Sequence, residues 1–533
     1  MPTSCIPFRE TGYFSGLICD YVEENKALQA FYRRFPRPGD FKPQLREKSA
    51  SFPQENRDRL SEVLREQYQH IDPPEITLRH IEKLREARTF TVTTGHQLNI
   101  FTGPLYFIYK IISTINLARH LQHTYPHHHF VPVYWMATED HDFEEISHFT
   151  YRGETLRWQR EATGAVGELS TEGLETVFHN FERLLGKGTQ AEALKKLFKN
   201  TYVAHSNLTE ATRYLVNELF GDYGLVIVDA HEKRLKDLFI PCIKEELLHG
   251  TSYQKVSDTI AKLNALSGDY TVQVQPRECN LFYLKPGLRE RIIKKDNRYY
   301  INDTGISFTE KAILNEVDKH PERFSPNVIM RPLYQEVILP NLCYIGGGGE
   351  IAYWLELKDY FEASGIPFPI LMLRNSALVL TEKQAKKLEK LHLSRKVLFS
   401  DRETLINDKV REISDIPIDL SPQKNYLQQQ FKGLYDLAEK TDRSFLGAVK
   451  AQEKKQLNGL EKLEKRLLKA QKRKEAGYVN RITLLHQALF PDKKLQERSV
   501  NFSELYMAYG DRFIPMLMEA LDPFKICFLV MTL

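Results

Sequence analysis

A strand, a glycine turn, a helix and a second strand follow one another early in the chain, and this order constrains the fold more than any other feature. Residues 88–94 form a β-rich run that ends at Gly95. Residues 105–122 place apolar side chains three and four apart, as an amphipathic helix does, and residues 130–136 are a second apolar run. Two parallel strands need a helical crossover of this kind between them. We therefore predict an α/β fold with a parallel sheet covered by helices.

Two later segments extend the predicted sheet. Residues 224–230 and 366–373 are short, continuous apolar runs, which are typical of strands buried on both faces. Residues 151–220 and 251–330 mix hairpin and helix patterns, and we interpret them as insertions. The sequence therefore predicts a doubly wound α/β core over residues 1–375 that carries two insertions.

The pattern becomes helical after residue 375. Apolar residues recur in alternating steps of four and three, which is the spacing of a coiled coil. We predict a long antiparallel helical hairpin within residues 376–496, after which residues 497–533 return to the core as a helix and a strand. The predicted seam residues are Leu427, Phe431, Leu434, Ala438, Thr441, Phe445 and Ala448, followed by Leu460, Leu463, Leu467 and Ala470.

The net charge of the 533-residue chain is concentrated in this hairpin. Lys and Arg number 74 and Asp and Glu number 70, so the whole chain carries only +4. Residues 450–474 hold ten Lys and Arg against three Glu, which gives +7 and leaves −3 for the remainder. A basic helix can bind polyanions, but these lysines are not interleaved with aromatic side chains that stack on bases. A solvated coiled-coil face explains the charge better, and we expect no nucleic-acid partner.

The cysteines and the apolar runs bear on the compartment. The six cysteines are widely spread and form no CxxC pair, so we expect reduced, mostly buried thiols in a cytoplasmic protein. The first residues lack the pattern of a signal peptide. No run reaches the roughly 18–20 apolar residues that span a bilayer, and we interpret the apolar tail 524–533 as a buried terminal strand. We therefore expect no membrane partner.

Polar side chains crowd the turn that follows the first predicted strand. Residues 93–110 lie where a strand ends and a helix begins, which is the edge of an open α/β sheet where ligands bind. Free N–H groups at the start of the helix can hold a phosphate or a carboxylate. A plain turn with a capped helix is the alternative. The candidate binding residues are Thr94, Gly95, His96, Gln97, Thr102, Gly103 and, further into the helix, Lys110.

The second predicted strand is followed by a loop rich in acids. Carboxylates beside an imidazole suit general acid–base catalysis, because neighbouring charges shift the pKa values of both groups. We interpret Asp140, His141 and Asp142 as candidate catalytic residues and Glu139 as a substrate contact. Asp140 and Asp142 can also hold Mg²⁺ or another divalent ion. An acid-rich helix start, favoured by the helix dipole, is the alternative.

A run of four glycines follows another predicted strand and precedes a helix. Glycines there let the backbone approach a ligand closely, although a glycine run alone is equally typical of a flexible loop. Glu350 falls in the first helical turn, where its carboxylate can contact an amine. The candidate binding residues of this segment are Arg331, Gly346, Gly347, Gly349, Glu350 and Tyr353.

These three segments, in this order, resemble the BshC family, which adds cysteine in bacillithiol biosynthesis. The similarity rests on TTGHQLNIFTGPLYFIYKI, VPVYWMATEDHDFEEISH and HPERFSPNVIMRPLYQEVILPNLCYIGGGGEIAYWLELK together with the late coiled coil, and it covers essentially the whole chain. The resemblance implies a Rossmann-like core related to the nucleotidyltransferases, with connecting-peptide insertions. It also implies a coiled-coil domain that supports a homodimer. It assigns no catalytic residue.

The reaction implied by the resemblance joins the carboxyl group of L-cysteine to the amine of glucosaminyl-malate, which forms an amide and completes bacillithiol. A free carboxylate does not react with an amine at a useful rate, so we expect activation by ATP or another nucleotide with Mg²⁺. Our hypothesis places the nucleotide phosphates at the turn 95–104 and lets His141 accept the amine proton. Glu350 would hold the cysteine ammonium or the sugar, and Arg331 or Lys110 would hold the malate.

Two other functions stay open at the level of the sequence. The chain can be another nucleotide-dependent carboxylate-activating or nucleotidyltransferase-like enzyme of the same architecture. It can instead be a non-catalytic dimeric scaffold that presents the basic arm to an acidic partner. The acid-rich loop beside a polar glycine turn argues against a pure scaffold.

Overall fold

The computed structural model describes residues 3–266, 270–441 and 443–533. The chain divides into two compact units. The first contains Thr3–Leu378 and Leu495–Met531, and the second contains Val379–Lys494 and Thr532–Leu533. None of the helices within these residues is both long and apolar enough to cross a membrane.

The core of the first unit is a five-stranded parallel sheet, which confirms the predicted fold class. Its strand order is β13-β12-β2-β3-β6, and every neighbouring pair is parallel. From β2 the chain adds β3 and β6 on one side and later adds β12 and β13 on the other. The strands are β2 (Thr89–His96), β3 (His129–Met136), β6 (Val226–Asp229), β12 (Asn341–Gly346) and β13 (Ile370–Leu373).

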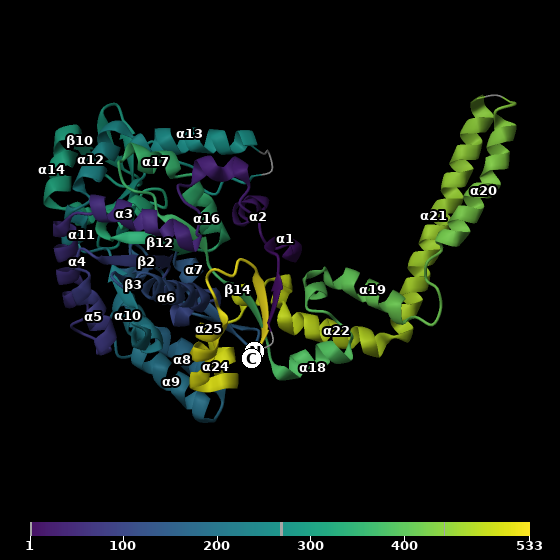
Figure 1. The fold of residues 1–533 in the computed structure, drawn as a ribbon, viewed down its shortest axis with the longest axis horizontal. Helices are drawn as coiled ribbons and strands as arrows, with labels where there is room; N and C mark the ends of the chain where they lie inside the picture. The colour runs from purple at the N-terminus through teal and green to yellow at the C-terminus, as the bar shows by residue number, and fades with distance from the viewer. Residues whose placement is uncertain (1–2, 267–269, 442) are drawn as a thin grey trace. The chain divides into compact units, whose positions relative to one another are not determined.

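Helix α6 (Tyr106–Thr124) is the crossover that the sequence predicted between the first two strands of the sheet. It packs against β2 and β3, as Figure 1 shows, and is buried on most of its surface. Phe90 and Val92 of β2 form an apolar core with Leu117 and Leu121 of α6. Alternate residues of a strand share one face, so this core fixes which face of β2 is turned toward the helix.

Helices make up most of the N-terminal residues, as their amphipathic pattern indicated. Helix α3 packs on β12, and α4 packs on α5 and α15. The N-terminal helices are α1 (Phe8–Thr11), α2 (Gly16–Val22), α3 (Phe41–Ser51), α4 (Gln54–Gln67) and α5 (Glu75–Lys83). The helices that flank β12 and β13 are α15 (Arg331–Ile338), α16 (Gly348–Leu355) and α17 (Lys358–Ala363).

Two long excursions leave the parallel sheet. The first, between β3 and β6, holds a hairpin and four helices: α7 (Phe143–Ile146), β4 (His148–Tyr151), β5 (Glu154–Arg157), α8 (Leu174–Leu185), α9 (Thr189–Tyr202) and α10 (Leu208–Phe220). The second, between β6 and β12, holds an antiparallel sheet of order β10-β9-β8-β7-β11. Its elements are α11 (Lys233–Asp237), α12 (Ile240–His249), α13 (Thr251–Leu266), β7 (Leu281–Lys285), β8 (Leu288–Lys295), β9 (Arg298–Ile301), β10 (Ser307–Thr309), α14 (Glu310–Lys319) and β11 (Phe324–Pro326).

The two ends of the chain meet in the first unit. Strand β1 (Thr3–Ile6) pairs antiparallel with β15 (Phe528–Thr532), so the apolar tail is a buried strand, as predicted. Cys5 and Cys527 form a disulfide with a Cα–Cα distance of 5.6 Å. The expectation that all six cysteines are reduced is therefore wrong for this pair, because strand pairing joins residues that are 522 positions apart. The returning segment also contains α23 (Gln496–Ser499), α24 (Phe502–Tyr509) and α25 (Phe513–Ala520).

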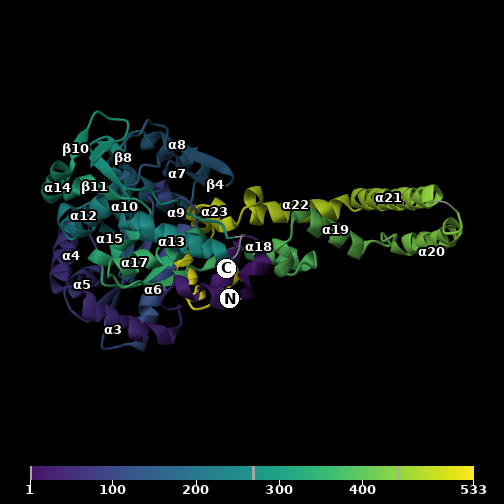
Figure 2. The same ribbon diagram turned by 90° about the horizontal axis from the view of Figure 1, so that it is seen from above.

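The second unit contains an antiparallel helical hairpin made of α20 (Ser421–Ala438) and α21 (Arg443–Lys474). These helices lie side by side in Figures 1 and 2. Tyr435 donates to Glu453 at 2.6 Å, and Lys424 pairs with Glu464 at 2.8 Å, which fixes the antiparallel register. The remaining helices are α18 (Glu382–Lys390), α19 (Arg402–Ile413) and α22 (Ala476–Leu489), and β14 (Ser376–Leu380) leads into this unit.

The predicted seam of the hairpin is only partly correct. The sequence pattern ran without interruption through residues 427–448, but α20 ends at Ala438 and the chain turns before α21 begins. Phe431 and Ala438 pack with Val449 in the apolar core, whereas Leu434 is 42% exposed. The helix after the turn has its own register of seam positions. Continuing the period of α20 across the turn therefore assigns the wrong residues to the seam of α21.

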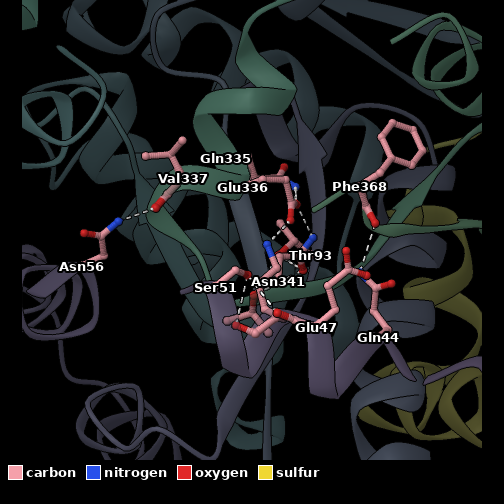
Figure 3. A network of polar contacts seen from close by, with 12 residues as sticks. Gln44, Glu47, Ser51, Asn56, Thr93, Gln335, Glu336, Val337, Asn341 and Phe368 are labelled. Atoms are coloured by element: carbon pink, nitrogen blue, oxygen red, sulfur yellow. Dashed lines mark hydrogen bonds and ion pairs between the residues drawn. The ribbon is translucent and has the colours of Figure 1, made fainter. Parts of the chain in front are cut away.

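A buried ion pair connects the helices to the parallel sheet. Lys48 of α3 donates to Glu336 of α15 at 2.9 Å, and both side chains are almost completely shielded from water. Glu336 also accepts from Asn341 at 2.6 Å and from Gln335 at 3.1 Å (Figure 3). Asn341 Oδ1 accepts in turn from Thr93 at 2.9 Å. The network therefore ties two helices to β2 and β12.

Replacing Lys48 by Met should destabilise the first unit by about 3–5 kcal/mol, because Glu336 would remain buried without its counter-ion. Chemical denaturation of the full chain measures this loss. The double variant K48M/E336Q should recover more than half of it, since the buried charge is then removed. Lys42→Met, at an exposed position of the same helix, is the control and should change stability by less than about 0.5 kcal/mol. Equal stabilities of K48M and the wild type would contradict this account.

Candidate active site

A cavity of about 710 Å³ opens at the carboxyl ends of the parallel strands. Its walls include residues that follow β2, β3, β6, β12 and β13. The direction of chain progression reverses between β2 and β12, and ligands of open α/β sheets bind at such a switch point. The three segments singled out from the sequence therefore converge on one cavity.

Most of the predicted binding residues lie in the cavity wall. These are Gly95, His96, Gln97, Lys110, Glu139, Asp140, Arg331, Gly347, Gly349, Glu350 and Tyr353. The structure does not place the others in that wall: Thr94, Thr102, Gly103, His141, Asp142 and Gly346. The wall also contains residues that the sequence gave no reason to select, namely Tyr106, His231, Gln273, Arg289, Arg374 and Arg498.

Lys110 of α6 and Glu350 of α16 form an ion pair at the switch point, in which the Lys110 side chain is buried and that of Glu350 is 25% exposed. Lys110 Nζ lies 2.5 Å from Glu350 Oε2 and donates to the carbonyl oxygen of Gly95 at 2.8 Å. Glu350 also accepts from the Tyr344 hydroxyl at 2.6 Å and from Gly347 N at 2.8 Å. Burial alone would raise the pKa of Glu350, but the Lys110 ammonium and these donors hold it below its usual value. Lys110 and Glu350 contact each other here, and the expectation that Glu350 holds the cysteine ammonium or the sugar and that Arg331 or Lys110 holds the malate stays a prediction.

Asp140 lies in the cavity wall beside β2. Its Oδ2 accepts from Gln97 at 2.7 Å, and its Oδ1 accepts from the backbone N–H of His141 at 2.7 Å. Gln97 also donates to Glu145 at 2.9 Å. Burial would raise the pKa of Asp140, but hydrogen bonds from Gln97 and from the backbone N–H of His141 outweigh it and hold the pKa well below its usual value. Asp140 is therefore an ionised carboxylate that can orient a cationic amine.

Glu139 faces a cationic pair supplied by β6 and α11. Its Oε1 lies 2.9 Å from His231 Nδ1 and 2.6 Å from Lys236 Nζ. Burial opposes the charged form of both groups, but the Lys236 charge lowers the pKa of Glu139 to about 2, and hydrogen bonds to Glu139 and Glu168 raise the pKa of His231 to about 10. This end of the cavity therefore holds fixed charges at neutral pH.

Arg289 reaches the cavity from β8 of the second excursion. Its guanidinium stacks on the Phe282 ring at 3.8 Å from the centroid. One of its N–H groups lies 2.7 Å from His141 Nδ1, and because a guanidinium can only donate, that imidazole nitrogen is the acceptor. His141 is thus held beside Asp140, at 3.5 Å between Nδ1 and Oδ1, although its side chain is half exposed.

The turn 95–104 does not form the phosphate cradle that the sequence suggested. Residues 95–97 line the cavity, but the chain then turns into the protein at Phe101, which packs among other aromatic rings. Asn501 donates to the carbonyl oxygens of Phe101 and Gly103, and Val500 O accepts from the N–H of Leu105. The start of α6 is therefore covered by the returning C-terminal segment, which sequence periodicity could not reveal.

Three other predicted site residues have supporting positions. Thr94 donates to Ile345 O at 2.7 Å and thereby links β2 to β12. Asp142 caps α7 by accepting from Glu145 N at 3.2 Å, which matches the helix-start alternative for this acid. A Cβ on Gly346 would lie 3.1 Å from the Tyr344 ring, so this glycine allows close packing.

The helix start that faces the cavity is that of α16. Gly347 is its N-cap, and Gly347, Gly348 and Gly349 all line the cavity. The glycine run is therefore an ordered strand-to-helix turn rather than only a flexible loop. Within the part of the chain that the structure describes, no group of three or more His, Cys, Asp or Glu side chains is arranged to hold a metal ion.

Two family models match the chain. One is described as the N-terminal Rossmann-like domain of BshC of bacillithiol biosynthesis and matches residues 1–375. The other is described as the C-terminal coiled-coil domain of BshC and matches residues 377–533. The chain belongs to the BshC family.

BshC relatives match along both units. The protein named "Putative cysteine ligase BshC" of Flavobacterium johnsoniae is 54% identical over 533 residues, which is 100% of both chains. The protein of the same name from Christiangramia forsetii is 55% identical and covers 100% of this chain and 99% of its own. The one from Lysinibacillus sphaericus is 27% identical over 94% of each chain.

In this BshC-family chain, the buried carboxylate of Glu356 holds the wall segment that contains Gln273 and Val274. Glu356, which follows α16, accepts from the backbone N–H of Gln273 at 2.8 Å. Gln273 and Val274 belong to the cavity wall. Burial raises the pKa of Glu356 to about 7, despite the hydrogen bonds from this backbone. This wall segment is therefore held by a carboxyl group, that of Glu356, which titrates near neutral pH.

Glu356 should make the thermal stability depend on pH. Its folded-state pKa lies above the unfolded value of 4.5, so the native state binds the extra proton and loses stability as the pH rises from about 4.5 to about 7. Glu356→Gln cannot titrate, and its melting temperature relative to the wild type should therefore rise between pH 5 and pH 8. Glu278→Gln, at an exposed position of the same segment, should show no such trend. A constant difference between E356Q and the wild type would contradict the assignment.

Proposed function

We propose that this chain is a cysteine ligase that joins the carboxyl group of L-cysteine to the amine of glucosaminyl-malate in the last step of bacillithiol formation. The proposal rests on its BshC membership and on one observation, the division of charge in the cavity. The ionised carboxylate of Asp140 lies at the end of β3, where Glu139 is already paired with Lys236 and His231, and Arg374 and Arg498 lie toward β13. A substrate that carries an amine at one end and carboxylates at the other complements this division.

The reaction sets clear demands on the protein groups. The carboxyl carbon of cysteine must lose one oxygen and gain the amine nitrogen. The ammonium must give up one proton before it attacks and a second one as the amide forms. The cavity must therefore orient the amine beside a proton acceptor, which is the usual task of a general base.

Asp140 and His141 are the residues that we assign to this task. Asp140 is fixed by Gln97 and stays ionised, so it attracts and orients the substrate ammonium. His141 Nδ1 accepts from Arg289, which leaves this nitrogen without its own proton. It can take a proton from the amine once the contact with Arg289 opens.

A nucleotide would supply the activation that a free carboxylate lacks, by converting it to an acyl-adenylate or an acyl-phosphate. The groups present at the acidic end fit such a ligand. Arg289 Nε is buried and has no hydrogen-bond partner in the described chain, so it can receive a phosphate oxygen. Asp140 can approach a Mg²⁺ ion carried by the phosphates. A nucleotide-dependent reaction requires the nucleotide supply of the cytoplasm, and we propose that the protein acts in that compartment. A disulfide such as Cys5–Cys527 is uncommon there.

Reconstitution tests the proposed reaction. Purified full-length protein with L-cysteine, glucosaminyl-malate, ATP and Mg²⁺ should give a product with the mass of bacillithiol. Asp140→Asn and His141→Ala should each lower kcat by about a hundredfold or more. Glu144→Gln, in the same loop but exposed and paired with Arg157, is the matched control and should keep wild-type activity.

Three results would count against the proposal. Full activity of both D140N and H141A would overturn the residue roles. No product with any nucleotide would overturn the one-enzyme ligase reaction. A product of another mass, formed from a different amino acid or amine, would instead identify a related carboxylate-activating enzyme.

We also propose that the hairpin α20–α21 makes the protein a homodimer. Apolar side chains remain exposed on it, among them Tyr426 at 64%, Leu437 at 52% and Leu463 at 59%. Burying them against a second hairpin would remove this apolar surface from water.

The double variant L437D/L463D should therefore elute as a monomer, with its mass measured by light scattering, where the wild type elutes as a dimer. Lys455→Glu, at an exposed position of the same hairpin, should remain a dimer. A monomeric wild-type protein, or a dimeric double variant, would refute this interface.

A further inference from the structure

Besides Arg289 Nε, the cavity wall contains two buried polar atoms that no group of the described chain satisfies. Arg374 Nε and His96 Nε2 have no hydrogen-bond partner within the described residues. Both side chains are shielded from water, since Arg374 is only 3% exposed and His96 only 9% exposed. Both residues line the cavity. A buried donor without a partner costs free energy, so such atoms are typically satisfied by a ligand or by water. Both atoms lie in the part of the cavity toward β13.

Arg374 is fixed so that its Nε edge is presented to this space. One terminal nitrogen donates to Asn375 O at 2.9 Å and to Ser376 at 3.0 Å, and the other donates to Glu497 at 2.8 Å. The Nε edge of the guanidinium faces the start of α16. A Cβ atom placed on Gly347, the N-cap residue of α16, would lie 3.8 Å from Nε. Three hydrogen bonds to protein groups thus hold the guanidinium in place, and its Nε–H stays unused.

His96 lies next to the same space. Its ring packs edge-on against Tyr106 at 5.4 Å, and the Arg374 guanidinium lies 5.2 Å from the same tyrosine ring. Burial and the nearby charges of Lys110 and Arg374 lower the pKa of His96 well below its usual value, so the imidazole is neutral. A neutral imidazole has one N–H group to donate, and the free Nε2 can carry it.

Backbone donors complete this group. The first N–H groups of a helix have no acceptor within the helix, and those of Gly348 and Gly349 open α16 in the cavity wall. The helix dipole adds a partial positive charge at this point. Arg498, from the returning C-terminal segment, stands at the exposed side with its guanidinium 6.0 Å from the Tyr106 ring.

The charges at this end do not cancel. Four cationic side chains, those of Lys110, Arg331, Arg374 and Arg498, stand against the two carboxylates of Glu350 and Glu497. Both carboxylates are already paired, Glu350 with Lys110 and Glu497 with Arg374. Even with Glu145, whose charge also acts on Tyr106, the cationic side chains outnumber the carboxylates here, which favours an anionic ligand.

We propose that Arg374, His96, Arg498 and the first turn of α16 form an anion subsite that binds a dicarboxylate. One carboxylate accepts from Arg374 Nε, from His96 Nε2 and from the α16 amides, and the second pairs with Arg498. This inference deepens the proposed function, on which it rests, by assigning the malyl group of the amine substrate to this end. The sugar amine then extends along the sheet edge past β12 and β2 toward Asp140 at the end of β3.

A nucleotide phosphate shares the oxyanion chemistry of a carboxylate and is the rival occupant. The dicarboxylate fits better because the carboxylates at this end are paired with side chains and are not available to a Mg²⁺ ion. Unpaired acids that could approach such an ion lie toward β3, at Asp140 and Glu145. The two occupants can be separated by direct binding measurements that need no turnover.

Calorimetric titration of the full-length protein with L-malate, and separately with ATP, tests the subsite. Arg498→Ala and His96→Leu should each weaken L-malate binding by about tenfold or more and leave ATP binding within about twofold, because each removes a hydrogen bond to a charged group. Arg374→Lys keeps the positive charge but removes the Nε donor, and it should weaken malate binding similarly. Arg79→Ala, an exposed arginine of α5 that is remote in sequence from the subsite, should bind both ligands as the wild type does.

Each outcome decides the proposal. Melting temperatures of H96L and R374K must stay close to that of the wild type for their binding data to count, and R498A, at an exposed position, provides the test in any case. Loss of ATP binding with unchanged malate binding would overturn the proposal in favour of a phosphate site. Absence of malate binding to the wild type would overturn it as well. Product formation in the reconstitution judges the ligase reaction separately, so failure of the subsite and failure of the function are distinguishable.

Discussion

The ion pair between Lys110 and Glu350 is the interaction on which the cavity depends. It joins the helix that follows β2 to the helix that follows β12, across the point where the sheet changes direction. The same two side chains also hold Gly95 O, the Tyr344 hydroxyl and Gly347 N. A buried ion is tolerated only when its partners satisfy it completely, so the pair fixes the two glycine-containing turns in one geometry. The cavity between them is therefore preformed.

The division of charge along the sheet edge follows from strand order. β13 and β12 bring arginines and a helix start to one end, whereas β3 brings the ionised carboxylate of Asp140 to the other, beside a Glu139 that Lys236 and His231 already pair. Each charge is held by neighbours in a setting shielded from water, where electrostatic interactions are stronger than in bulk solvent. A small ligand with opposite charges at its two ends therefore has one preferred orientation in this cavity.

Late segments of the chain complete a site that early segments begin. Arg289 comes from the second excursion, and Arg498 comes from the segment that returns after the helical hairpin. Asn501, also from that segment, holds the turn after β2 through two carbonyl oxygens. The first unit thus needs both parts of its sequence before the cavity has its walls.

The sequence by itself determined the parallel α/β core, the helical hairpin, and the place of three polar segments at the ends of predicted strands. These conclusions follow from local periodicity and from the rule that parallel strands end on the same side. Only the tertiary structure decided which polar groups are free. Lys110 and Glu350 satisfy each other, whereas Arg374 and His96 each keep an unused polar atom. The start of α6 is covered and that of α16 is open, and Cys5 meets Cys527. The physical reason is that hydrogen-bond satisfaction and burial depend on neighbours that are distant in sequence, and periodicity carries no information about them.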